Sequence, residues 1–191
     1  PFVDDKYGLI KNIYDLPTYS GLPRIEVKMA FGGDYSTAGF NASGAGITAQ
    51  HAKNSAIGEY IERFSCLHQG NVKVLKKENY VSPKRLNSLA KGVETDYMWV
   101  EGKDIIEDKS IMLPADAIYL TYRSDDNSSK GKWITTSTGA ACGQNLAQTC
   151  WKGIAEILER DSFQYHWRRQ LTCQEIDLSS NKELQDYYLQ Y

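Results

Sequence analysis

The chain has 191 residues, of which 41% are hydrophobic and 24% are charged, and its formal net charge is −2. This length and composition suit one compact domain with a hydrophobic core, or two small ones. No basic block gives an electrostatic reason to expect nucleic acid or a membrane surface as partner, and no apolar run approaches the roughly 20 residues that span a bilayer. Both classes of partner are therefore set aside.

The cysteines and the chain ends add two expectations. None of the four cysteines is part of a C-x-x-C pair, and the three histidines lack zinc-like spacing, so free thiols in a reducing cytoplasm are expected. The chain begins without Met and ends in a polar, Tyr-rich run. We expect residues 1–191 to form one part of a longer protein.

The first third of the chain predicts a strand, a glycine-rich turn and a long helix. Alternating polar and apolar residues at 24–31 predict a half-buried strand, and a helix is predicted from about Ala49 to Leu67. Between them, Gly44 to Ala49 matches G-x-G-x-x-A. The residues before this match do not resemble the buried hydrophobic strand that a dinucleotide-binding turn requires, so it is interpreted as a glycine turn entering the helix.

The rest of the chain predicts further strands and a second long helix. Residues 71–81 and 97–105 resemble strands, 82–92 a short helix or loop, 117–122 a strand, and 122–132 a polar surface loop. A short strand entering a second glycine turn is predicted at 133–144, followed by a helix from about Asn145 to Trp167. Several strands lack intervening helices. The fold predicted is therefore α+β, a two-layer α/β sandwich with a mixed or antiparallel sheet and two long amphipathic helices.

The two predicted helices carry the same charged pattern. On a helical wheel, one side of the first helix presents Ser55, Glu59, Glu62, Arg63 and Cys66, and its other side is apolar. One side of the second helix likewise presents Thr149, Lys152, Glu156, Glu159, Arg160 and Phe163. Each helix can bury an apolar face while it projects two carboxylates, three residues apart, and an arginine.

Two interpretations of these charged faces stay open. A charged face opposite an apolar stripe is typical of any solvated surface helix. The alternative is that the two faces converge, in which case four carboxylates would repel one another unless divalent cations were present. Mg²⁺ takes oxygen ligands and is usually shared with substrate phosphates, which Arg63 and Arg160 could contact bidentately. The chemistry favoured by this second interpretation is Mg-nucleotide binding and phosphoryl transfer.

Taken together, the two stretches resemble the motifs of the YcaO family. Residues 43–65, SGAGITAQHAKNSAIGEYIERFS, are similar to its first motif, and residues 137–167, STGAACGQNLAQTCWKGIAEILERDSFQYHW, are similar to its second. The resemblance covers most of the chain but only the N-terminal, nucleotide-binding part of a YcaO protein. It implies an ATP- and Mg²⁺-dependent enzyme that activates a peptide backbone amide and converts Cys, Ser or Thr residues to azolines, as in bacteriocin biosynthesis.

The resemblance also implies roles for individual residues and partners. The Mg²⁺ ligands would be Glu59, Glu62, Glu156 and Glu159, and the nucleotide contacts would be Ser55, Arg63, Gln144 and Arg160. No catalytic residue is assigned. The expected partner is a precursor peptide; an adenylating-enzyme-like partner protein and a homodimer stay open. We expect catalytic activity from the full-length protein and none from the isolated fragment.

Several positions depart from the family pattern. Ala45 and Thr138 stand where the family often has Lys and Asn, and a Ser, Glu and Gln pattern before the second helix is replaced by Ala141, Gln148 and Lys152. Losing a Glu and gaining a Lys removes negative charge near the proposed metals. A non-catalytic scaffold that docks a precursor peptide or partner enzyme is therefore an alternative, as is a family member that forms thioamides.

Overall fold

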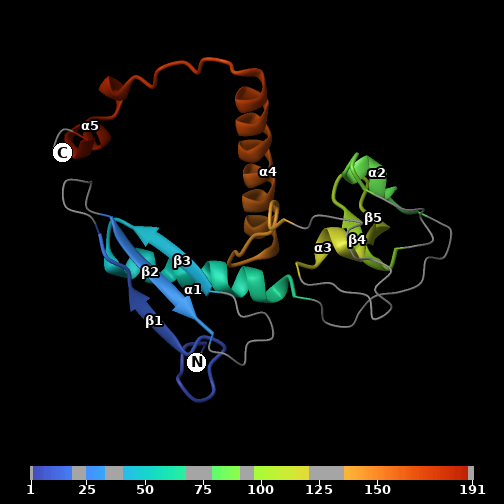
Figure 1. The fold of residues 1–191 in the computed structure, drawn as a ribbon, viewed down its shortest axis with the longest axis horizontal. Coiled ribbons are helices and arrows are strands. Elements are labelled where there is room, and N and C mark those ends of the chain that lie inside the picture. Colours follow the sequence, from blue (N-terminus) through green and yellow to red (C-terminus); the bar gives the residue numbers. More distant parts are fainter. Residues whose placement is uncertain are drawn as a thin grey trace. The chain divides into compact units, whose positions relative to one another are not determined.

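The computed structural model describes residues 2–18, 25–32, 41–67, 79–90, 97–120 and 136–188. The chain divides into two compact units, one comprising Pro1–Glu62 with Thr138–Tyr191 and the other Arg63–Ser137. Helices and antiparallel strands occur in both (Figure 1). In the described ranges, no helix is long and apolar enough to cross a membrane.

The first unit contains a three-stranded antiparallel sheet in the order β1 (Asn12–Asp15), β2 (Glu26–Phe31) and β3 (Asn41–Gly46). The register pairs Ala30 with Ala42 and Lys28 with Gly44. Lys28 also forms an ion pair with Asp15 on β1. The strand predicted at 24–31 is confirmed, and it is the central strand of this sheet.

Helix α1 (Ala49–Ser65) packs against β3 through very small residues. Ala52, Ala56 and Tyr60 are the buried residues of α1, and Ala42 is buried on β3. A Cβ atom built at Gly44 would lie 2.6 Å from both the Ala52 carbonyl oxygen and the Ser55 carbonyl carbon. The helix therefore rests almost directly on the backbone of the strand, and the pair forms the two-layer α+β arrangement predicted from the sequence.

The glycine turn predicted before this helix is wrong in its local structure. Gly44, Ala45 and Gly46 belong to β3, and only Ile47 and Thr48 separate the strand from α1. The reason is steric: glycine is uncommon inside strands except where another backbone approaches closely, and here that backbone is α1. Because β3 pairs antiparallel with β2, the G-x-G-x-x-A match does not form a parallel dinucleotide-binding unit.

The second unit contains a hairpin of β4 (Trp99–Asp104) and β5 (Lys109–Pro114) and two one-turn helices, α2 (Pro83–Leu86) and α3 (Ala115–Ile118). Its core includes Trp99, which is fully buried and packs edge-on against Tyr80 and Tyr97. The predicted strand at 97–105 and the short helix within 82–92 are confirmed.

Other predictions in this region fare differently. The strand predicted at 117–122 is wrong where it is described, because Ala115–Ile118 form α3 and the Tyr119 amide closes that turn onto the Ala115 carbonyl. Strands β1 and β5 were not predicted. The loop at 122–132, most of the strand at 71–81 and the start of the 133–144 segment lie outside the described residues; residues 136–144 form no strand.

The chain ends in α4 (Leu146–Arg169), a 3-10 turn (Leu178–Ser180) and α5 (Lys182–Tyr188). The second predicted long helix is confirmed as α4, which extends two residues further than expected. It ends at Gln170, whose left-handed backbone lets its amide bond to the carbonyls of His166 and Trp167.

Candidate functional site

The first candidate residues lie on α1 beside its buried face. Glu59, Glu62 and Arg63 are half-buried, and Ser55 is exposed. All four stand on the wheel beside Ala52 and Ala56, which contact β3, so the close helix–strand contact fixes the direction of this charged face. Arg63 is the first residue of the second unit.

The second set lies on α4, whose start is well capped. The Asn145 side chain accepts a hydrogen bond from the Gln148 amide at 2.9 Å, as a typical N-cap does. Gln148 in turn accepts a hydrogen bond from the Gln144 amide at 2.7 Å through its side-chain oxygen. The first of these bonds fixes the first turn of α4, and the second fixes the backbone at Gln144.

A glycine-containing turn precedes α4, as the sequence predicts, and it lies against the helix. Gly139 has φ +90°, a conformation that favours glycine, and a Cβ built at Gly153 would lie 2.6 Å from the Gly139 carbonyl oxygen. Gly153 is also the only buried residue among the described positions of α4. The helix and the turn before it therefore touch backbone to backbone.

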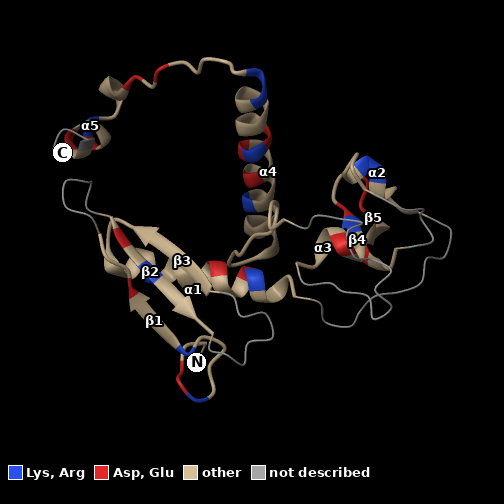
Figure 2. Ribbon diagram, viewed as in Figure 1, with Lys and Arg blue, Asp and Glu red and all other residues tan. Residues whose placement is uncertain are grey.

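Acidic and basic residues both occur along α4 (Figure 2), and Glu156, Glu159 and Arg160 share one face of this helix, as helical spacing requires. Arg160 and Glu156 form an ion pair with 3.8 Å between nitrogen and oxygen; the Arg160 side chain is 61% exposed and that of Glu156 27%. Pairs this accessible contribute about 0–1 kcal/mol. A nucleotide phosphate could therefore replace Glu156 as the partner of Arg160, and the free energy lost with the ion pair would be small. Phe163 and Trp167 stack at a ring separation of 5.9 Å on the continuation of this face.

The opposite face of α4 is apolar, as predicted, but the described residues do not cover it. Trp151 is 70% exposed and Leu158 is 62% exposed. Each of the two helices was expected to bury an apolar face. Helix α1 does so, whereas the apolar face of α4 is exposed among the described residues.

The positions that depart from the family pattern now have locations. Ala45 is exposed on the face of β3 opposite to Gly44, and so on the side away from α1. Thr138 and Ala141 lie in the turn before α4. Lys152 donates a hydrogen bond from its ammonium group to the Cys142 carbonyl at 3.0 Å. From the sequence, Gln148 and Lys152 were interpreted only as replacements of family residues. Their four-residue spacing was the signal that they lie on the same side of the helix and could contact the same turn.

The donor chemistry of these faces fits Mg²⁺. Glu59 and Glu62 on α1, and Glu156 and Glu159 on α4, supply the carboxylate oxygens that this ion prefers. Each helix carries one pair of carboxylates. Within the ranges that the structure describes, no three His, Cys, Asp or Glu side chains group closely enough to hold a metal ion. All four glutamates belong to these ranges, so the structure does not bring their carboxylates together into one metal-binding cluster.

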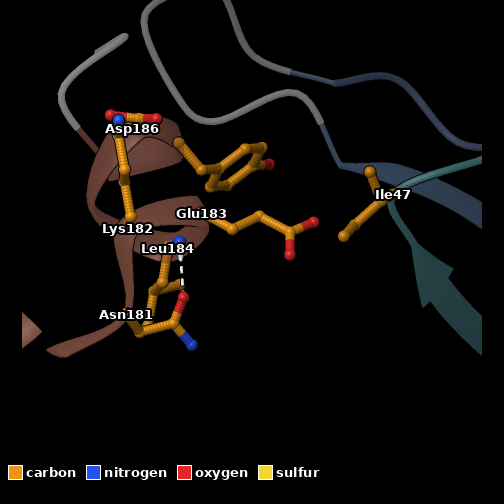
Figure 3. Close-up of a pocket in the computed structure, with 7 residues that line it drawn as sticks. Ile47, Asn181, Lys182, Glu183, Leu184 and Asp186 are labelled. Carbon is orange, nitrogen blue, oxygen red and sulfur yellow. Dashed lines mark hydrogen bonds between the residues drawn. The ribbon is translucent and has the colours of Figure 1, made fainter.

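A hollow of about 720 Å³ lies elsewhere, lined by Ile47 and residues of the segment 181–187 (Figure 3). There the Asn181 side chain caps α5 by accepting a hydrogen bond from the Leu184 amide at 3.0 Å. None of the eight candidate residues lines this hollow, so it is not the candidate site.

Comparison with known proteins identifies the family. Residues 43–191 match the family model of the YcaO cyclodehydratases, a family described as binding ATP and Mg²⁺. The chain belongs to the YcaO family. The match begins within β3 and includes both charged helices.

Solved structures of other proteins share the fold. YcaO from Methanopyrus kandleri, bound with AMPPCP and Mg²⁺, is 18% identical with a TM-score of 0.74, covering 95% of this chain and 46% of that one. A heterocyclase in complex with substrate and cofactor is 20% identical with a TM-score of 0.78, covering 99% and 30%. The E. coli microcin synthetase McbBCD complex is 19% identical with a TM-score of 0.58, covering 81% and 41%.

A relative by sequence is an uncharacterized protein of Methanothermobacter thermautotrophicus, 22% identical over 147 residues. The alignment covers 72% of this chain and 37% of that protein. This chain therefore spans less than half the length of the relatives it matches.

Proposed function

We propose that this chain supplies the nucleotide-binding helices of an ATP- and Mg²⁺-dependent enzyme that activates a peptide backbone amide. The reaction is the cyclodehydration of Cys, Ser or Thr residues to azolines in a ribosomally made peptide of the bacteriocin type. Membership in the YcaO family supports the ATP and Mg²⁺ dependence. The heterocyclase and microcin synthetase among the structural relatives support the peptide chemistry.

The observation that carries the proposal is the doubled Glu-x-x-Glu-Arg face. On α1 it comprises Glu59, Glu62 and Arg63, and on α4 it comprises Glu156, Glu159 and Arg160. Solvation alone explains one such face. It does not explain why each helix lies so close to another backbone that a Cβ added at a glycine would clash, at Gly44 of β3 beneath α1 and at Gly153 of α4 against Gly139. Anchoring of this kind holds a charged face in a fixed direction, which ligand binding needs.

Each residue then has a chemical task. The four glutamates hold Mg²⁺, which when bound neutralises charge on the nucleotide phosphates. Arg63 and Arg160 contact phosphate oxygens as planar, bidentate donors. Ser55 on α1 and Gln144 before α4, both exposed, donate or accept hydrogen bonds at the nucleotide.

The peptide chemistry is a phosphoryl transfer with a net loss of water. The side-chain thiol or hydroxyl of the peptide adds to the preceding carbonyl carbon, and the resulting oxyanion takes the γ-phosphoryl group of ATP. Phosphate then leaves as the ring double bond forms, and ADP is the second product. Catalysis of this kind depends mainly on positioning and charge neutralisation. Both fit a site built from carboxylates and arginines without a nucleophilic side chain.

The proposal extends to partners and location. A precursor peptide is the substrate, and an adenylating-enzyme-like protein is the candidate partner that delivers it. All four cysteines are free, which fits a reducing cytoplasm.

Calorimetry with Mg-ATP on the whole protein tests the site. We expect the Glu59→Gln and Glu156→Gln variants to bind about 10- to 100-fold more weakly, because a contact to a charged group contributes about 1.5–3 kcal/mol. The matched control is Glu183→Gln on α5, an exposed glutamate outside the site. Wild-type heats in all three variants would refute the assignment.

A non-catalytic scaffold is the second candidate, and one observation favours it. The Lys152 ammonium lies one helical turn before Glu156 and adds positive charge to the face that is to receive a metal ion. The two functions differ in turnover. ATP hydrolysis stimulated by a Cys- or Ser-containing precursor peptide would exclude the scaffold, and the mass of the product would separate a loss of water from the oxygen-to-sulfur exchange of thioamide formation.

A further inference from the structure

The turn before α4 lies on one particular face of the helix. Residues 142–144 contact Gln148, Thr149 and Lys152, while Gly139 lies against Gly153 and Ile157. At 100° per residue, Gln148, Thr149 and Lys152 share the face that continues, one turn later, with Glu156 and Glu159. Residues 142–144 therefore lie over the N-terminal part of the charged face, one helical turn before the carboxylates.

Side chains of α4 hold this turn at two points. The Gln148 side-chain oxygen accepts from the Gln144 amide at 2.7 Å, and the Lys152 ammonium donates to the Cys142 carbonyl at 3.0 Å. Between these points Gly143 lies so close that an added Cβ would meet the Thr149 hydroxyl at 2.6 Å. The two side chains therefore bond to the backbone at Cys142 and Gln144, on either side of Gly143, where the turn lies closest to the helix.

We infer that Gln148 and Lys152 are positioning residues that hold residues 142–144 on α4 before any nucleotide binds. Held in this way, Gln144 keeps its backbone fixed while its exposed side chain stays free to reach a nucleotide over Glu156 and Glu159. The inference rests on the proposed function for the identity of the ligand. It assigns Lys152 the role of a hydrogen-bond donor to the protein's own backbone, and not that of a phosphate contact.

The chemistry of the two side chains gives a sharp set of variants. Lys152→Met removes the donor and keeps most of the stem, whereas Lys152→Gln restores a donor without the charge. Gln148→Leu removes the acceptor, whereas Gln148→Glu keeps it. Lys182→Met on α5 is the matched control, because Lys182 is an exposed lysine away from this turn. Circular dichroism of each variant verifies that α4 is intact.

Two measurements on the whole protein test the inference. The first is amide hydrogen exchange of residues 142–144 without nucleotide, which reports opening of the turn. The second is the Kd of Mg-ATP. We expect Lys152→Met and Gln148→Leu to speed exchange and to raise the Kd roughly tenfold or more, as loss of supporting residues typically does. Lys152→Gln should restore both, Gln148→Glu should restore slow exchange, and Lys182→Met should change neither.

The outcomes separate the inference from the proposed function. If amide exchange of residues 142–144 is unchanged in Lys152→Met, Lys152 does not hold the turn on α4 and the inference is wrong. If exchange is faster but the Kd of Mg-ATP is unchanged, Lys152 holds the turn but does not position it for the nucleotide. A Kd raised equally by Lys152→Met and Lys152→Gln also overturns this positioning role, since the charge would then be what matters. The wild-type protein could bind no Mg-ATP while Lys152→Met still speeds exchange. In that case the proposed function and the nucleotide role of the turn are both wrong, but the hold of Lys152 on residues 142–144 is supported.

Discussion

Gly44 on β3 lies directly beneath Ala52 on α1: a Cβ at Gly44 would stand 2.6 Å from the Ala52 carbonyl oxygen. This contact sets both the distance of α1 from β3 and the orientation of this helix, which carries Ser55, Glu59 and Glu62. A single methyl group at residue 44 has no room unless α1 moves.

Gly44→Ala is therefore expected to destabilise the protein by about 1–3 kcal/mol, the usual cost of overpacking a tight contact. Ser43→Ala is the matched control, because Ser43 is exposed on the opposite face of the same strand. Chemical denaturation of both variants measures the difference. Equal midpoints for the two would show that the helix–strand contact is looser than described.

Asn145→Ala removes the N-cap of α4 and should lower stability by about 0.5–2 kcal/mol. The Asn145 side chain accepts from the Gln148 amide at 2.9 Å, and alanine leaves that amide without its acceptor. Asn145→Asp keeps an acceptor and should stay close to wild type. Thermal unfolding followed by circular dichroism tests the pair, and an alanine variant as stable as the aspartate variant would contradict the capping role.

Arg160→Met separates stability from binding. Its ion pair with Glu156 is long and accessible, at 3.8 Å with Arg160 61% exposed, so stability should change by less than about 1 kcal/mol. Mg-ATP affinity should fall about tenfold, because a charged contact to phosphate is lost. Arg160→Lys should recover only part of it, since lysine cannot bind bidentately. Unchanged affinity in Arg160→Met would exclude a phosphate contact.

The β4–β5 turn should respond to acid through Asp104. Hydrogen bonds from the amides of Glu107 and Ile106, at 3.1 and 2.9 Å, lower the pKa of the Asp104 carboxyl below its ordinary value. A carboxyl whose folded-state pKa is lowered stabilises the fold above its unfolded-state pKa, and this contribution disappears as pH falls through the folded-state pKa.

We therefore expect Asp104→Ala to be less stable than wild type at neutral pH, with the gap narrowing in strong acid. Thermal unfolding across that pH range measures the gap. A gap of constant size would show that the charged form of Asp104 is not the one stabilised.

The sequence predicted the two long helices well because each has a continuous apolar stripe and a charged face. Helix α4 also has Asn145 at its start, a residue type that favours helix starts. The glutamates and arginines among the eight candidate residues were found from the doubled Glu-x-x-Glu-Arg spacing, and Ser55 and Gln144 were assigned from the family resemblance. Seven of them lie on α1 and α4, and Gln144 lies in the turn before α4; the function of all eight stays a prediction.

Other features could not be predicted because distant contacts decide them. Strand β3 reads as a glycine turn, since only the backbone of α1 lying on Gly44 explains glycines within a strand. The segment after β5 has residue types typical of strands. It nevertheless forms the helical turn α3, in which the Tyr119 amide bonds to the Ala115 carbonyl. The roles of Gln148 and Lys152 likewise depend on a turn that folds back onto α4.

The central claim is that the carboxylates of α1 and α4 serve one Mg-nucleotide site. A double-mutant cycle of Glu59→Gln and Glu156→Gln, read as Mg-ATP affinity of the whole protein, tests it most directly. If both residues hold the same Mg-nucleotide, each single variant weakens binding about tenfold or more, and the double variant loses clearly less than the product of the two single losses. Losses that simply multiply, or single variants that bind as wild type does, would contradict a shared site.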